Sequence, residues 1–475
     1  MAGSAEKLLL CFNMFLVHLQ LWSFLLPISY SATVTYLPGF QGPLPFELET
    51  GYVGVGGESE EDVQLFYYFI KSEKNPKKDP VLLWLTGGPG CSSLSGLLYE
   101  IGPLRLVMEE YTGSLPNLSY NPYSWTKVAS IIFVDSPVGT GFSYSRSSQG
   151  YQTGDFESSK HLYQFLSKWM IGHPEFVENP FYAAGDSYSG RTVPLVTKLI
   201  SDGNEAGSEL FINIKGYILG NPTTDPVLES NKLVPYAHGM GLISDELYES
   251  VKNSCGENYV QIDPTNVQCL KDIQSFHKCI SGLNTAHILE PLCDFGSPKP
   301  KERVGDRRSL TQNYKEYFLV PHPSNSVLDC RDYAYYLTEC WTNDNSVRNA
   351  LHIHKGSIGK WQRCHRDLPY SHEIQNSIQY HVNLSKKGYR SLIYSGDHDM
   401  MVPFVATEAW IKSLNYSIID EWRSWIVEGQ IGGYTRTYSN RMTFATVKGG
   451  GHTAPEFKPK ECIAMFNRWI SEEPL

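Results

Sequence analysis

Ser187 stands in a sequence context typical of a catalytic nucleophile. Residues 185–190 read GDSYSG, with Gly185 and Ser189 two positions either side of the serine. A sharp strand-to-helix turn that exposes a serine hydroxyl requires small residues at those positions. The flanking patterns agree, because residues 181–184 are strand-like and residues 191–200 are helical. Such a motif arises about once by chance in a chain of this composition, so the prediction depends on partner residues elsewhere.

A nucleophilic serine needs a general base, and the base needs a carboxylate that orients it. His452 follows three glycines and comes shortly after a predicted strand at 443–448. Asp397 and Asp399 follow another predicted strand. The order serine, aspartate, histidine is a known chain order for such a triad. Spacing alone leaves both aspartates open, and a lone histidine in a glycine loop is more often a surface residue.

The transition state of acyl transfer also needs N–H groups that stabilise an oxyanion. Residues 84–93 read WLTGGPGCSS and follow a predicted strand, where a glycine-rich loop can present its backbone. We expect the N–H groups of Gly88 and Tyr188, the residue after the nucleophile, to form the oxyanion hole. A phosphate-binding loop is the alternative, but the Lys-Ser/Thr ending of a P-loop is missing.

The elements that must position these residues alternate between strand-like and helical segments, which predicts an α/β sheet. Predicted strands cover residues 63–70, 81–85, 130–135, 181–184, 215–219, 391–395 and 443–448, and a last helix covers 459–470. The pattern breaks between about 225 and 340, where cysteines concentrate. We interpret that region as an inserted, disulfide-linked cap. The 475 residues allow about three domains, but motifs of one site run from Trp84 to His452, which favours one domain over 32–475.

Composition excludes several classes of protein. Charged residues make up 19% of the chain and aromatic residues 13%, which is typical of a globular protein rather than a disordered one. The net charge of −10 argues against nucleic-acid partners, which select for basic surfaces. No motif indicates a metal or another cofactor, and the oligomeric state has no readable signal.

The N-terminus predicts entry into the secretory pathway. Residues 8–26 form the only long apolar run, preceded by Lys7 and followed by small residues near Ser31. This pattern is typical of a signal peptide, which we place at 1–31. An uncleaved anchor is the alternative, although His18 and Gln20 interrupt the run. After cleavage we expect no membrane span, and a secreted or vacuolar location.

The cysteines and the N-x-Ser sequons fit an oxidising compartment. Nine cysteines remain after signal cleavage, so at least one is unpaired within the chain. No CxxC or HExxH motif supports a zinc site, so disulfides are the better interpretation. Three asparagines, Asn117, Asn383 and Asn415, are candidate glycosylation sites.

Taken together, the motifs resemble those of the plant serine carboxypeptidase-like family. The matching blocks are WLTGGPGCSS (84–93), DSPVGTGFSYS (135–145), GDSYSG (185–190), GYILGNP (216–222), YSGDHDMMVP (394–403) and GGGHTAPE (449–456). The resemblance implies an α/β-hydrolase fold with a central mixed sheet and a helical cap. It implies Ser187 as nucleophile, His452 as base and Asp399 as acid, with Asp397 as the fallback. The same resemblance implies Gly88 and Tyr188 as oxyanion donors.

Two positions depart from the hydrolytic members of that family. Those carry Asn in WLNGGPG and Glu in GESYAG, where this chain has Thr86 and Asp186. Thr lacks the amide donors, and Asp is one methylene shorter than Glu, which changes its reach by more than about 1 Å. The chain is instead similar to the acyltransferase branch, which moves an acyl group from a 1-O-β-glucose ester to an acceptor hydroxyl. We expect Thr86, Gly87, Asp186 and Glu100 to contact substrate, although Glu100 is equally compatible with a surface or helix-capping role.

The resemblance leaves two other functions to be weighed. A serine carboxypeptidase that releases C-terminal residues at acid pH is the alternative enzyme. A non-catalytic binding protein of the same fold is disfavoured, because every element of the triad and the hole is present. The resemblance also implies the disulfides Cys91–Cys340, Cys255–Cys269 and Cys293–Cys330. It further suggests excision of a basic linker at 297–308 in the cap, as in some relatives.

Overall fold

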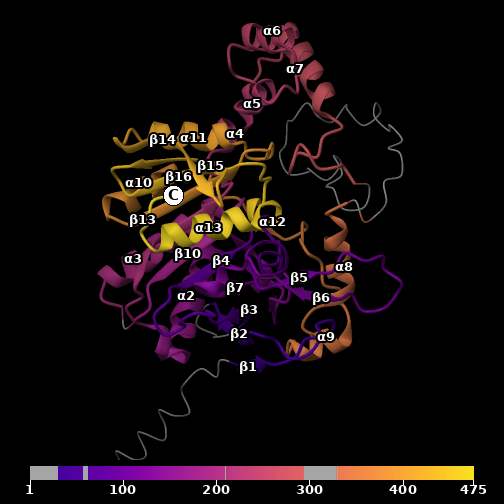
Figure 1. Cartoon of the computed structure of the whole chain (residues 1–475), viewed down its shortest axis with the longest axis vertical. Coiled ribbons are helices and arrows are strands. Elements are labelled where there is room, and N and C mark those ends of the chain that lie inside the picture. Colours follow the sequence, from indigo (N-terminus) through magenta and orange to yellow (C-terminus); the bar gives the residue numbers. More distant parts are fainter. Residues whose placement is uncertain (1–29, 57–61, 209, 294–327, 329) are drawn as a thin grey trace, which may run out of the picture.

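The computed structural model describes residues 30–56, 62–208, 210–293, 328 and 330–475 (Figure 1). The predicted signal peptide, apart from residues 30 and 31, and the predicted cap linker lie outside these ranges. The main sheet has 12 strands. In spatial order they are β1 Tyr30–Val34, β2 Leu48–Val55, β3 Val63–Ile70, β7 Ser130–Val134, β4 Val81–Leu85, β10 Phe181–Asp186, β11 Ile214–Gly220, β13 Arg390–Gly396, β16 Met442–Val447, β15 Gln430–Tyr438 and β14 Ile418–Val427, with β8 Tyr144–Ser145 on β3.

The sheet is mixed, with a parallel centre and antiparallel margins. The strands from β7 through β4, β10, β11 and β13 to β16 pair in parallel. The strands outside them pair antiparallel. Two small sheets join β5 (Leu104–Leu106) to β6 (Leu118–Tyr120) and β9 (Thr153–Gly154) to β12 (Tyr370–Ser371). Every strand that the sequence predicts is present in the main sheet, within a few residues of its predicted ends.

Helices cover both faces of the sheet, because its central strands are apolar on both sides. In β4, Leu82 and Trp84 enter one core while Leu83 and Leu85 enter the other, as the alternation of side chains along a strand requires. The helices are α2 Asp155–Gly172, α3 Ser189–Glu205, α4 Pro226–Asn231, α5 Leu233–Gly239, α6 Asp245–Cys255, α7 Val267–Ile280, α8 Tyr333–Thr342, α9 Asn345–Ala350, α10 Ile378–Lys386, α11 Phe404–Ser413, α12 Ala454–Phe457 and α13 Pro459–Ile470. Helices α2, α3 and α11 pack on one face and α13 on the other (Figure 1). A parallel core flanked by antiparallel strands and covered on both faces is the α/β-hydrolase fold, as predicted.

The predicted cap contains helices of two kinds. Helices α5, α6 and α7 project beyond the sheet (Figure 1), and their apolar side chains form a core of their own with Met400. Helix α8, at the end of the predicted region, instead buries Leu337 and Trp341 in the main core, and Trp341 Nε1 donates to the Pro38 carbonyl at 2.7 Å. Among the described residues of the predicted cap, the part with its own core consists of α5 to α7, and α4 adjoins it.

The structure contradicts one predicted disulfide. Cys91 pairs with Cys364, not with Cys340. The reason is local, because residues 363–365 run antiparallel beside the glycine loop: the N–H of His365 donates to the Gly90 carbonyl at 2.8 Å. Cys340 belongs to α8 and has a free thiol, as have two further cysteines, Cys279 and Cys462.

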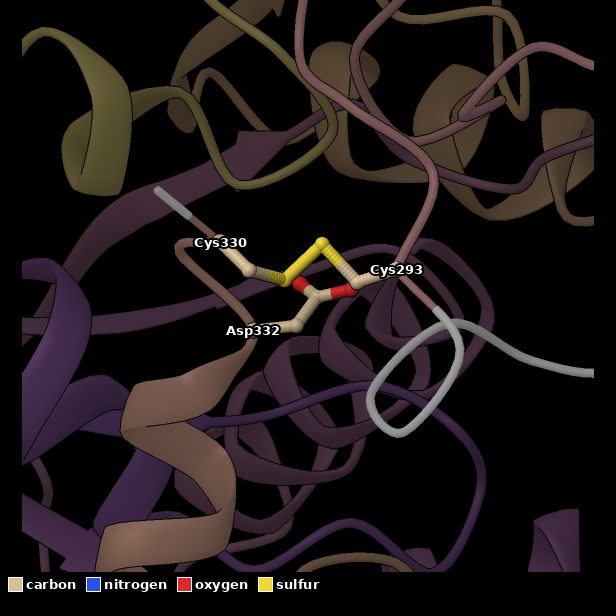
Figure 2. A group of neighbouring side chains, drawn as sticks. All are labelled: Cys293, Cys330 and Asp332. Carbon is tan, nitrogen blue, oxygen red and sulfur yellow. A yellow bond between two sulfur atoms is a disulfide. The ribbon is translucent and has the colours of Figure 1, made fainter. Parts of the chain in front are cut away.

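The other two predicted disulfides, Cys255–Cys269 and Cys293–Cys330, are present. Figure 2 shows Asp332 beside the second of them, so the three residues resemble a small cluster of metal ligands. The two sulfur atoms are bonded to each other, however, and neither is a thiolate. This cluster is a disulfide with a neighbouring carboxylate.

The predicted glycosylation sites occupy different surroundings. Asn117 and Asn415 are exposed, whereas Asn383 is half-buried in α10. Glycosylation and entry into the secretory pathway remain predictions. Within the described ranges, no helix combines the length and apolar character that a membrane span needs.

Candidate active site

Ser187 lies on the turn between β10 and α3, at the carboxyl end of the central parallel strands. Its φ is 55°, a left-handed value that is rare for a serine and marks a strained turn. The turn is held in place by two hydrogen bonds, from the Ser187 N–H to the Gly220 carbonyl at 2.9 Å and from the Thr223 N–H to the Ser187 carbonyl at 2.8 Å. The predicted strand–turn–helix context is therefore present.

His452 and Asp399 complete a chain of contacts with Ser187. His452 Nε2 lies 2.8 Å from Ser187 Oγ, and His452 Nδ1 lies 2.8 Å from Asp399 Oδ2. Asp397, the other candidate acid, accepts hydrogen bonds from His398 Nδ1 at 2.6 Å and from the Gly449 N–H at 2.7 Å instead. These contacts identify Asp399, rather than Asp397, as the acid that orients His452.

Asp399 is 0% exposed, and its carboxylate is satisfied by donors besides His452. Oδ1 accepts from the Met401 N–H at 2.7 Å, and Oδ2 accepts from Asn221 Nδ2 at 2.8 Å. Asn221 Oδ1 also accepts from the Gly396 N–H at 3.0 Å, which joins the end of β11 to the end of β13. Asn221 was not among the predicted site residues; its only signal was its place in a matching block directly after a predicted strand.

The glycine loop after β4 lies directly against the nucleophile. A Cβ on Gly87 would come within 2.6 Å of Ser187 Cβ and 2.8 Å of Tyr188 N, so only glycine fits. Gly88 has a φ of +121°, again a conformation for glycine. Tyr188 is the N-cap of α3, where helix geometry supplies no intrahelical acceptor for the N–H. The structure therefore brings together the loop and the residue that the sequence assigns to the oxyanion hole.

Two acids are buried beside this loop. Asp186 is 3% exposed and accepts from the Gly87 N–H at 3.2 Å, and burial raises its pKa to about 6. Glu100 is 2% exposed, and among the described residues neither of its carboxylate oxygens has a hydrogen-bond partner. Burial and then the charge of Asp186 raise the pKa of Glu100 well above its usual range. The negative charge of one acid disfavours ionisation of the other, so the pair resists losing both protons.

Thr86 and Arg363 complete the surroundings of the two buried acids. Thr86 Oγ1 accepts from Trp84 Nε1 at 3.3 Å, so its hydroxyl proton is free to point elsewhere. Arg363 was missed by the sequence analysis; its positive charge opposes the increase in the pKa of Asp186 and of Glu100. It belongs to the segment that pairs with the glycine loop, a placement that only the tertiary structure reveals.

A cavity of about 190 Å³ lies between α4, α7 and the loop after β13. Met400, Met401 and Ile280 supply apolar walls, and Glu229 supplies a carboxylate. Glu229 is one of the charges that raise the pKa of His452, so this wall of the cavity lies near the triad.

The pKa of His452 gives a testable pH dependence. Burial opposes its protonation, but the Asp399 carboxylate, followed by Asp186 and Glu229, outweighs burial and raises the pKa. Only the neutral imidazole can accept the Ser187 proton, so activity is lost as pH falls through this raised pKa. We expect the acid limb of kcat/KM to lie above about 6.5, the value for an unperturbed histidine. A pH–rate profile measures this directly; a limb near pH 5 would contradict it.

A serine, a histidine and an aspartate in hydrogen-bond contact at the carboxyl edge of this sheet define an enzyme with a serine nucleophile. The family model described as serine carboxypeptidase matches residues 38–472, and the chain belongs to that family. Serine carboxypeptidase-like 2 of Arabidopsis thaliana is 54% identical over 448 residues, which cover 94% of each chain. Serine carboxypeptidase-like 12 of the same plant is 55% identical over 450 residues, covering 94% of this chain and 96% of the relative.

A solved structure supports the fold independently. The chain superposes on Kex1(Δ)p, a prohormone-processing carboxypeptidase of Saccharomyces cerevisiae, with a TM-score of 0.71 and 20% identity. The match covers 93% of this chain and 95% of the yeast chain. The plant serine carboxypeptidase-like family, the α/β-hydrolase fold and the enzymatic nature of the protein all stand as predicted, while the reaction and substrate do not follow from these names.

Proposed function

We propose that the protein is an acyltransferase that moves an acyl group from a 1-O-β-glucose ester to an acceptor hydroxyl. The observation that carries the proposal is the pair Thr86 and Asp186, beside the nucleophile. Where hydrolytic relatives have an amide, Thr86 offers a single hydroxyl proton. Asp186 accepts the hydrogen bond of the Gly87 N–H, so this N–H is not available to a substrate carboxylate. The two positions therefore offer few donors to the carboxylate of a peptide C-terminus.

The same surroundings suit a sugar. Hydroxyl groups of glucose can donate to the Asp186 and Glu100 carboxyl groups and accept from Thr86. A buried carboxyl group without a hydrogen-bond partner, as in Glu100, is costly until such a donor arrives. Binding a neutral polyol compensates that cost without bringing a further negative charge to these acids.

The reaction proceeds in two steps. His452 Nε2 accepts the proton of Ser187 Oγ as that oxygen attacks the ester carbonyl, and the N–H groups of Gly88 and Tyr188 stabilise the oxyanion. Glucose leaves with the proton from His452, and an acyl-Ser187 ester remains. His452 then accepts the proton of the acceptor hydroxyl as that oxygen attacks the acyl carbonyl, and it returns the proton to Ser187 Oγ as the ester bond to the serine breaks. These steps require no metal or other cofactor. The acceptor outcompetes water when it is held at high effective molarity.

The alternative, a carboxypeptidase active at acid pH, also has an observation in its favour. The raised pKa values of Asp186 and Glu100 mean that both acids carry protons at low pH. Protonated carboxyl groups donate hydrogen bonds, so they can bind a terminal carboxylate in those conditions. Hydrolysis of an N-acyl dipeptide at acid pH, with no transfer from acylglucose at any pH, would establish this alternative.

Replacing Thr86 and Asp186 by the residues of the hydrolytic relatives tests the proposal. Thr86→Asn with Asp186→Glu is expected to lower transfer from a 1-O-acylglucose by about 10-fold or more, since discrimination by single groups in a pocket is of this order. The double variant is also expected to gain cleavage of an N-acyl dipeptide, assayed from about pH 5 to about pH 8 so that the range in which His452 is neutral is included, because the asparagine amide restores donors for a carboxylate. Both products are quantified by chromatography for the wild type, the two single variants and the double variant. Unchanged transfer in the double variant would contradict the assigned role of these side chains.

A further inference from the structure

Asp155, at the start of α2, collects four hydrogen bonds from separate parts of the chain. Its Oδ1 accepts from the Tyr188 hydroxyl at 2.8 Å and from the Tyr370 hydroxyl at 2.7 Å. Its Oδ2 accepts from the backbone N–H groups of Glu373 and Ile374, both at 2.7 Å. The side chain is 0% exposed. A buried carboxylate with four donors is a rigid junction, because each of the charge-assisted hydrogen bonds compensates part of the cost of burying the charge.

One of these donors belongs to the residue next to the nucleophile. The Tyr188 ring reaches Asp155, while its backbone N–H lies beside Ser187. The Tyr188 hydroxyl also lies 2.8 Å from His372 Nδ1. Since the hydroxyl proton is donated to Asp155, His372 Nδ1 must donate to the Tyr188 oxygen. The guanidinium of Arg191 covers the ring at 4.9 Å from its centre, so the ring is fixed on several sides.

The segment 363–374 connects this junction to the other half of the oxyanion hole. Its first part is bonded to the glycine loop through the Cys91–Cys364 disulfide and the hydrogen bond from the His365 N–H to the Gly90 carbonyl. Its last part is bound to Asp155. The two donors of the hole come from loops far apart in sequence, and this one segment contacts both loops. Pairing of β4 with β10 places the two loops side by side, and this segment adds a second, bonded connection between them.

We propose that Asp155 is a positioning residue of the oxyanion hole, which fixes the Tyr188 N–H relative to the glycine loop through the Tyr188 hydroxyl and segment 363–374. The inference rests on the serine chemistry of the proposed function but holds for transfer and hydrolysis alike. Asp155 does not contact the reacting atoms. A shift of about 1 Å in one donor is enough to lower a rate about 100-fold.

Two tyrosines bound to the same carboxylate oxygen provide a matched pair of variants. Tyr188→Phe removes the hydroxyl that connects Asp155 to the hole, and Tyr370→Phe removes an equivalent hydroxyl that does not adjoin the nucleophile. With a p-nitrophenyl ester as substrate, we expect Tyr188→Phe to lower kcat by about 10- to 100-fold, with KM changed less than about 2-fold. Tyr370→Phe weakens the same junction but keeps the bond between Tyr188 and Asp155, so it should lower kcat by less than Tyr188→Phe does, even though the decrease in Tm is similar in the two variants. Asp155→Asn should match or exceed the loss in Tyr188→Phe.

A transition-state mimic separates positioning from general loss of structure. An aryl trifluoromethyl ketone forms a tetrahedral adduct with Ser187 whose oxyanion occupies the hole, so its Ki should rise in Tyr188→Phe in proportion to the fall in kcat. Equal losses of kcat in the two tyrosine variants, or an unchanged Ki in Tyr188→Phe, would overturn the inference. Failure of the wild type to react with either the ester or the ketone would instead overturn the serine chemistry of the proposed function, and this inference with it.

Discussion

Replacement of Ser187 by alanine is expected to abolish acyl transfer, with kcat lower by about 10⁵-fold or more. The reason is that Ser187 Oγ forms the covalent bond to the acyl group, and its hydroxyl is the group that the His452 ring 2.8 Å away activates. Binding of the donor should persist, since the glycine loop and the buried acids are unchanged. The measurement is steady-state transfer from a 1-O-acylglucose, together with donor affinity by calorimetry.

Ser148→Ala is a suitable control, because Ser148 is exposed and lies outside the site. It should retain wild-type kcat and KM. Residual transfer by Ser187→Ala within about 100-fold of the wild type would show that the reaction does not pass through an acyl-Ser187 ester.

The second large effect is expected for Asp399→Asn, which should lower kcat by about 10⁴-fold. The carboxylate 2.8 Å from His452 Nδ1 holds the imidazole in the tautomer that leaves Nε2 free to accept the serine proton. It is also the largest charge that raises the His452 pKa. An amide can present its N–H₂ to Nδ1 and favour the wrong tautomer. We therefore expect a large loss in kcat and an acid limb at lower pH in any residual activity.

Asp397→Asn provides the matched control, since Asp397 occupies the same loop and belongs to the same motif. Its carboxylate contacts His398 and Gly449, not His452, so a loss of less than about 10-fold is expected. Comparable losses in both variants would contradict the assignment of Asp399 as the orienting acid. The two are compared by kcat at saturating donor and acceptor.

Much of the framework is predictable because it depends on local patterns. The central strands are continuous apolar runs, and the nucleophile turn is marked by small residues around Ser187. The sequence pattern did not predict the exposed β14–β15 hairpin. Its apolar residues Ile419 and Trp422 face solvent at the edge of the sheet, so apolar and polar positions do not alternate regularly. An edge hairpin with one weakly buried face carries little periodic signal.

The rest of the site depends on contacts between distant segments. Asp397 and Asp399 are two residues apart, and only the position of the His452 loop distinguishes them. Cys340 and Cys364 were equally available in sequence, yet only residues 363–365 pair with the glycine loop. The junction at Asp155 was invisible for the same reason, since its partners lie more than thirty residues away or more than two hundred.

The most direct test of the proposed acyl transfer is the mass of the protein after exposure to a 1-O-acylglucose without acceptor. We predict an increase equal to one acyl group, located on the peptide that contains Ser187, and its disappearance when an acceptor alcohol is added, with formation of the new ester. Ser187→Ala should show no increase. A wild-type protein that acquires no acyl group from any 1-O-acylglucose, yet cleaves an N-acyl dipeptide, would contradict the account.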